Sequence, residues 1–233
     1  MRYFFTFDGR DSSDFGTYIA NSNMFDSPER DVESVVVPGK NGELTLDNGR
    51  WKNFAGEVEA YIPKDMQTNV PALREFLGTR LGYCRYSDSM HTEEFRLARF
   101  TGGLELDESD RVGASMTLKF DCMPQRWLVA GEVAKTYSAN GHIYNPTLCS
   151  ARPLIRAYGT GTFSIGGVSV QITAANQYTD IDCELMDAFK GATNCNGNIV
   201  LTNGEFPTIA PGLNAVTMTG ITSLIITPRW WRL

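Results

Sequence analysis

Residues 161–172 read GTFSIGGVSVQI, and apolar side chains alternate with polar ones on both sides of Gly166-Gly167. A period of two is typical of a strand with one buried face, and a Gly-Gly pair between two such runs predicts a tight hairpin. Further strands are expected on both sides of this hairpin, at 154–158, 178–183, 197–201, 215–218 and 223–228. Strands at this spacing, without a helical period, predict a β-sandwich of about 80 to 100 residues.

The N-terminal half is also mostly β in pattern, with one exception. Strands are expected at 32–37, 43–46, 55–62, 82–86, 94–100 and 114–122, and turns at Pro38-Gly39 and Asp47-Asn48-Gly49. After Asn69, the side chains of Leu73, Phe76 and Leu77 fall at helical spacing, and Pro71 suits a first helical turn. The pattern predicts one short amphipathic helix that packs on a sheet.

Turn-forming pairs mark the boundary between the two halves. They are Asn140-Gly141, Asn145-Pro146 and Arg152-Pro153, and they follow a shift in composition after Trp127. We therefore expect two mostly β domains, residues 1–138 and 139–233. The first is a β-sandwich or barrel-like domain with one helix, and the second is a smaller β-sandwich.

Composition and charge exclude several classes of protein. The chain has 233 residues, 42% of them hydrophobic and 21% charged, which is typical of a soluble globular protein. A net charge of −6 argues against general nucleic-acid binding. No apolar run approaches the roughly 18 to 20 residues that cross a membrane, and the N-terminus lacks a signal peptide, so folding in a cytoplasm is expected.

The cysteines and histidines do not form a recognisable metal site. The five cysteines are odd in number and contain no CxxC pair, so small buried thiols in a reducing compartment are expected. His91 and His142 stand alone, whereas zinc needs clustered ligands. We expect neither a metal nor a cofactor.

Two pairs of carboxylates are the only candidates for catalysis. Glu57 with Glu59, and Asp180 with Asp182, lie two residues apart on expected strands and so share a face at a separation of the order that glycosidases use, about 5 to 10 Å. A solvated strand face explains both pairs more simply. Neither histidine has a serine or cysteine context, and no GxSxG, Walker or HExxH motif is present. We expect no enzymatic activity.

The chain closes with Arg229-Trp230-Trp231-Arg232-Leu233. Tryptophan and arginine are enriched at binding hot spots, so Trp230 and Trp231 are candidates for docking a partner or for a domain junction. The alternative is a final strand that points one indole into the core.

Several segments resemble the distal tail protein (Dit) family of siphophages, especially those of Gram-positive hosts. The matching N-terminal segments are Phe7-Asp8-Gly9, Asp11 to Ile19, Pro28 to Glu33, Val37 to Leu44 and Asp47 to Arg50, with the motifs F-x-G-x-x-S-x-D-F-G, P-x-R-x-x-E and V-P-G-[RK]-x-G. The C-terminal matches are Phe206-Pro207, Pro211 to Asn214 and Ile226 to Trp231, whereas about 90–140 matches only in pattern.

The resemblance implies a structural virion protein at the tail tip, assembled in the cytoplasm of the host bacterium. Six copies would form one ring or two stacked rings between the tail tube protein and a tail-associated lysin or fibre hub. The N-terminal domain, with a protruding hairpin, would build the ring. A galectin-like C-terminal β-sandwich would point outward, where a receptor-binding protein can attach.

Within this frame, we expect the segment from Val37 to Arg50 to clasp the next subunit through Lys40, Glu43, Asp47 and Arg50. The alternative is an ordinary surface hairpin. Acidic groups are expected along the lumen, because DNA must pass without binding. Two other functions stay open: a carbohydrate-binding module for cell-wall glycans, and a tail tube subunit that polymerises.

Overall fold

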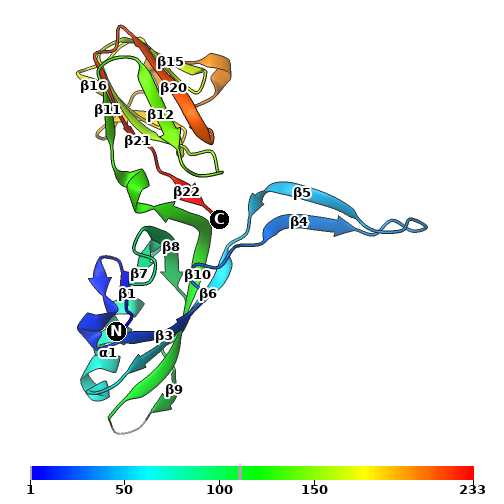
Figure 1. Ribbon diagram of the computed structural model, residues 1–233, viewed down its shortest axis with the longest axis vertical. Helices are drawn as coiled ribbons and strands as arrows, with labels where there is room; N and C mark the ends of the chain where they lie inside the picture. The colour runs from blue at the N-terminus through cyan, green and yellow to red at the C-terminus, as the bar shows by residue number, and fades with distance from the viewer. Residues whose placement is uncertain (1, 110–111) are drawn as a thin grey trace. The chain divides into compact units, whose positions relative to one another are not determined.

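The computed structural model describes residues 2–109 and 112–233 and is built mostly of antiparallel strands, which confirms the predicted fold class. Two compact units are present, Met1–Arg126 with Leu233, and Trp127–Arg232 (Figure 1). This division falls earlier than the predicted boundary after residue 138. The reason is that strand β11 (Lys135–Tyr137) already pairs with β21 (Ser223–Thr227) of the second unit.

The first unit contains one large sheet that curls on itself. Its strands run in the order β2-β1-β7-β8-β10-β6-β3, with β9 also paired to β10. A backbone bridge joins Tyr3, just before β1, to Ile19 of β3 at the far end of this order, so the sheet is barrel-like. The strands are β1 (Phe5–Phe7), β2 (Arg10–Asp11), β3 (Tyr18–Ser22), β6 (Phe54–Ile62), β7 (Cys84–Asp88), β8 (Glu94–Phe100), β9 (Leu106–Ser109) and β10 (Ala114–Leu128), while β22 (Trp231–Arg232) belongs to the second unit.

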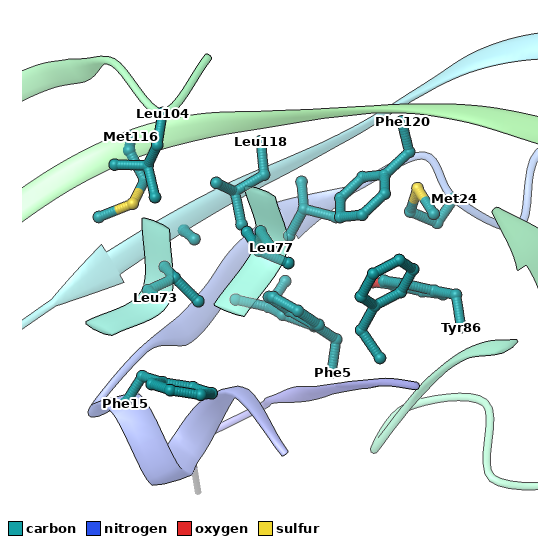
Figure 2. Close-up of a cluster of buried hydrophobic side chains, with 14 of the residues drawn as sticks. Phe5, Phe15, Met24, Leu73, Leu77, Tyr86, Leu104, Met116, Leu118 and Phe120 are labelled. Carbon is teal, nitrogen blue, oxygen red and sulfur yellow. The ribbon is translucent and has the colours of Figure 1, made fainter. Parts of the chain in front are cut away.

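An aromatic core fills this curled sheet (Figure 2). Phe5 stacks on Tyr86 with ring centroids 5.7 Å apart, and Phe120 meets both rings edge-on. The short 3-10 helix η1 (Ser12–Phe15) places Phe15 against Phe76 of the helix, at 5.1 Å between centroids. Burial of large aromatic rings is the main favourable term in such a core.

The predicted helix is present as α1 (Met66–Gly78), but it begins earlier than predicted. Leu73, Phe76 and Leu77 are buried as expected. The helix begins before Asn69, because the Asp65 carbonyl already accepts hydrogen bonds from the amides of Thr68 and Asn69. Pro71 therefore lies inside the helix rather than in its first turn.

Two strands of the first unit stand apart from the large sheet. They are β4 (Arg30–Val35) and β5 (Leu44–Trp51), which pair only with each other in a separate two-stranded sheet. Figure 1 shows them as a long ribbon with no further strand beside it. We call residues 30–51 the arm.

The second unit is a β-sandwich of two sheets. One contains β11, β21, β13 (Leu154–Tyr158), β16 (Tyr178–Asp182), β17 (Asp187–Lys190) and β18 (Thr193–Asn194) in this order. The other contains β12 (Gly141–Asn145), β20 (Gly212–Thr219), β14 (Gly161–Ile165), β15 (Val168–Ile172) and β19 (Ile199–Leu201). Three 3-10 turns complete it: η2 (Val129–Glu132), η3 (Asn196–Asn198) and η4 (Thr202–Gly204).

The Gly-Gly hairpin predicted at 161–172 is confirmed. Ile165 pairs with Val168 across a two-residue turn, in which Gly166 and Gly167 have φ of 59° and 90°. Both positions need the left-handed backbone that glycine adopts without steric cost. The inward side chains of both strands lie in the core of the second unit.

Candidate subunit interface

The arm is exposed along almost its whole length. Every residue from Val32 to Arg50 is exposed except Val37, and Asp31 is the one buried residue in the arm. The tip turns through Pro38 and Gly39, where the Lys40 amide donates to the Val37 carbonyl at 3.1 Å. An isolated two-stranded ribbon is at best marginally stable in water, so the arm needs either internal bonds or a partner.

One face of the arm carries uncovered apolar side chains. Val35 pairs directly with Leu44, and Leu46 lies on the same face two pairs further along the ladder, opposite Glu33. These three side chains, which we call the apolar stripe, are 42%, 45% and 56% exposed. Side chains opposite each other across antiparallel strands are neighbours, so the three form a continuous surface. An exposed apolar surface on a soluble protein is a feature of binding sites.

Ion pairs hold the arm together near its base. The Arg30 guanidinium donates to both carboxylate oxygens of Asp47, at 3.2 and 2.9 Å, and lies 4.8 Å from the Trp51 ring centroid. In a second ion pair, the Arg50 guanidinium donates to the Asp31 carboxylate at 2.6 Å. The Arg50 hydrogen bond holds the pKa of Asp31 below its ordinary value. The Gly49 amide, and then Arg30, do the same for the pKa of Asp47.

The four residues proposed from sequence therefore divide into two kinds. Asp47 and Arg50 are engaged within the arm by the bonds just described. Lys40 and Glu43 lie at the tip, are exposed, and have no ion-pair or hydrogen-bond partner for their side chains among the described residues. Lys40 and Glu43 are thus the charges that a neighbouring molecule can reach.

The turn predicted at Asp47-Asn48-Gly49 is wrong. The structure has a bulge there instead, inside strand β5, between the pairs Val32–Asp47 and Arg30–Trp51. The Asp47 carboxylate accepts from the Gly49 amide at 2.7 Å as well as from Arg30, so the extra residues are bonded locally and the ladder resumes. Such bulges bend a strand and increase its twist.

The two carboxylate pairs have different surroundings. Glu57 and Glu59 lie on the exposed face of β6, opposite Lys119 and Thr117 of β10, as a solvated face predicts. For Asp180 and Asp182 the expected solvated face is wrong, because both are 5% exposed.

Each of the two buried aspartates is neutralised by an arginine. Arg156 binds Asp180 through two bonds of 2.7 and 2.9 Å, and Arg229 binds Asp182 through two of 2.7 and 2.8 Å. Burial opposes the charge on Asp182, but the bonds from Arg229 and from the Leu185 and Glu184 amides outweigh it, and its pKa lies below the ordinary value. A carboxylate held in this way is a structural ion pair rather than a proton donor.

Trp230 and Trp231 are placed differently in the second unit. Trp230 is 3% exposed and belongs to the core cluster of that unit. Trp231 is half-buried, and its indole nitrogen donates to the Ser150 carbonyl at 3.0 Å. Trp230 thus has little surface to offer a sugar or a protein, and docking stays a prediction for Trp231.

The histidines and cysteines of the described ranges are not gathered into a site. His91 stacks on Phe25 at 4.5 Å and lies 3.0 Å from an Asp88 carboxylate oxygen, while His142 is exposed. Among the described residues, no group of three His, Cys, Asp or Glu side chains is arranged to hold a metal ion. Burial raises the pKa of the Cys122 and Cys183 thiols to about 12.

The expectation of buried thiols is correct for only part of the set. Cys122 and Cys183 are buried, whereas Cys84, Cys149 and Cys195 are half-buried.

In the described ranges, no helix is both long and apolar enough to span a membrane.

Comparison with solved structures identifies the architecture. The chain superposes on the crystal structure of SPP1 Dit (gp 19.1) with a TM-score of 0.79, covering 100% of both chains at 15% sequence identity. The chain has the Dit fold. The SPP1 protein is described as a paradigm of the hub adsorption apparatus in phages that infect Gram-positive bacteria. No protein-family model and no curated protein sequence matches the chain.

Within this Dit fold, sequence reasoning missed the groups that matter most to the arm. Arg30 and Asp31 bond the two strands together, yet only Asp47 and Arg50 were singled out. The sequence carried no clear signal for them, because the bulge shifts the register so that Arg30 pairs with Trp51 and not with Asp47. Leu44 and Leu46 of the apolar stripe were visible as alternating apolar residues of an expected strand, but their exposure was not.

Proposed function

We propose that this chain is a distal tail hub of a long-tailed phage, in which six copies form a ring between the tail tube and the adhesion apparatus. The observation that carries the proposal is the full-length match to a phage hub protein, which covers both units and not one common β-sandwich alone. A fold of two β units shared over 100% of both chains is a more specific likeness than a single sandwich.

The arm supports a ring in particular. A contact in which one surface patch of a subunit binds a different patch of the next closes into a ring when the rotation between subunits is right. The apolar stripe offers such a patch, because Val35, Leu44 and Leu46 are left uncovered by their own chain. Lys40 and Glu43 at the tip supply opposite charges that can fix the register on the neighbour.

The partners follow from this position in the virion. One side of a ring, or of two stacked rings, would meet the tail tube protein, and the other would meet a tail-associated lysin or fibre hub. The second unit would carry a receptor-binding protein. Assembly would take place in the host cytoplasm. With a net charge of −6, acidic groups are available to line a lumen that DNA crosses without binding.

The decisive experiment is a mass measurement by light scattering over a concentration series, with negative-stain images of the same samples. We expect about six times 25.8 kDa, or twice that for stacked rings, and six-fold particles. A variant with Val35→Ser, Leu44→Ser and Leu46→Ser should shift the mass toward the monomer.

The matched control replaces Val200 with Ser in the second unit, because Val200 is 55% exposed but lies outside the arm. Its rings should persist. Wild-type protein that stays monomeric at every concentration would contradict self-assembly, and rings that survive the triple substitution would remove the arm from the interface.

A further inference from the structure

Arg96 of β8 is fully buried in the first unit, at 0% exposure. Its Nη2 donates to the Asp26 carbonyl at 3.1 Å, while Nε and Nη1 have no hydrogen-bond acceptor among the described residues. Burial lowers the pKa of this guanidinium to about 10, so it is charged at neutral pH. A buried charge without a carboxylate partner costs free energy, and an apolar side chain would fill the same space at lower cost.

The contacts of Arg96 lie at the two points where the arm joins the rest of its unit. Asp26 precedes β4 on the incoming side. On the outgoing side, Phe54 is the first residue of β6, and its ring centroid lies 4.4 Å from the Arg96 guanidinium carbon. One side chain therefore binds the backbone of the incoming segment and the ring of the outgoing segment.

Neighbouring side chains reinforce the same junction. Arg126 of β10 donates to the Phe25 carbonyl at 3.4 Å, next to the bond made by Arg96. On the outgoing side, the Asn53 amide donates to the Tyr83 hydroxyl at 2.8 Å and to the Asp121 carboxylate at 3.2 Å. The Asn53 bonds are exposed to solvent, whereas Arg96 is shielded from it and holds its contacts without competition from water.

We propose that Arg96 is a positioning residue, which joins the two roots of the arm and sets the direction in which the arm leaves its unit. A planar guanidinium can donate to a carbonyl at its edge and stack on a ring with its face at the same time, which an ammonium or an apolar side chain cannot. This role of Arg96 rests on the proposed function, because a ring closes only if each arm points at the same angle to the next subunit.

Single-molecule fluorescence energy transfer tests this inference in the full chain. Dyes are attached at p-azidophenylalanine introduced at Lys40 in the arm tip and at Glu75 on α1, so the native cysteines are untouched. Single-molecule dilution keeps the chain monomeric. We expect one narrow transfer peak for wild type, and a peak at least about twofold wider for Arg96→Met, because a freed root samples more directions.

The controls separate positioning from folding. Arg96→Met should keep the thermal midpoint within about 3 °C of wild type, since an uncompensated buried charge is replaced by an apolar side chain. Arg74→Met is the matched control: Arg74 also donates to a backbone carbonyl, that of Leu104, but does not touch the arm, and its peak should stay narrow. Phe54→Leu, which removes only the stacking surface, should widen the peak and serves if Arg96→Met does not fold.

An Arg96→Met or Phe54→Leu peak as narrow as that of wild type would overturn the inference, as would a wild-type peak that is already broad. The result is independent of ring assembly. If the triple substitution in the apolar stripe leaves the rings intact, the proposed clasp fails, while the transfer measurement on monomers still decides the role of Arg96.

Discussion

The chain contains two long hairpins with similar local chemistry and opposite environments. Apolar and polar residues alternate along β14–β15 and along Leu44-Thr45-Leu46 of β5, and both hairpins turn at glycines. In β14–β15 the apolar side chains Phe163, Ile165, Val170 and Ile172 are at most 1% exposed. In the arm, the corresponding side chains are about half exposed.

The difference shows that alternation predicts a strand with an apolar face but not what covers that face. For β14–β15 the cover comes from the opposite sheet of the same sandwich. For the arm, the cover must come from another molecule if it exists at all. Stability should therefore depend on the first hairpin, and assembly on the second.

The largest expected contrast comes from truncating one apolar side chain in each hairpin. Ile165→Ala should lower the free energy of unfolding by about 2 to 5 kcal/mol, because it leaves a cavity in a packed core. Leu44→Ala in the arm should change it by less than about 0.5 kcal/mol, since Leu44 is already exposed to water. Urea unfolding followed by tryptophan fluorescence measures both.

Three of the four tryptophans lie in the second unit, so this signal reports mainly on the unit that contains Ile165. Equal losses for the two variants would mean that the arm is part of a cooperative core and that the comparison is mistaken.

A smaller contrast is expected at the turns. Gly166 has φ of 59°, and an added Cβ would lie 3.1 Å from the Thr208 carbonyl oxygen, so Gly166→Ala should cost about 1 to 2 kcal/mol of folding free energy. Gly42 at the arm tip has a similar φ of 79°, but nothing lies within 4 Å of an added Cβ. Gly42→Ala should strain only the tip and leave the thermal midpoint of both units unchanged, which differential scanning calorimetry can measure. A fall in midpoint for Gly42→Ala alone would show that tip and core unfold together.

The same comparison shows how far the sequence could predict the fold. Strong alternation located most strands, and Gly166-Gly167 located the tight turn, because both signals are local. The segment Asp47-Asn48-Gly49 was predicted as a turn but is a bulge. Arg30 on the other strand binds Asp47 and pairs with Trp51, so that the two strands continue beyond the bulge. That information is not local.

The site was predictable in position but not in its chemistry. The segment from Val37 to Arg50 was singled out, and it lies in the arm. Arg96 was not, because an arginine in an alternating strand is expected to face solvent, and only the three-dimensional path of residues 25 and 26 gives it a buried acceptor. Likewise, Asp180 and Asp182 are buried because Arg156 and Arg229 come from distant positions in the sequence.

The smallest expected effect concerns the order of the arm in acid. The pKa values of Asp31 and Asp47 are lowered in the folded chain by their arginine and amide partners. Because the folded pKa values are lowered, the ion pairs contribute fully to the stability of the folded arm above the unfolded pKa, near 3.8. This contribution is lost as the pH falls through the folded pKa values.

The heteronuclear NOE of the Ser34 and Thr45 amides in the monomer measures this loss of order. We expect the NOE to decrease when the pH is lowered below about 4. Asp47→Asn should already give lower values at pH 6, with a weaker dependence on pH, because only the Asp31 pair still titrates. A wild-type NOE that stays constant down to about pH 2.5 would show that the ladder alone orders the arm and that its ion pairs add little, as is common for exposed pairs.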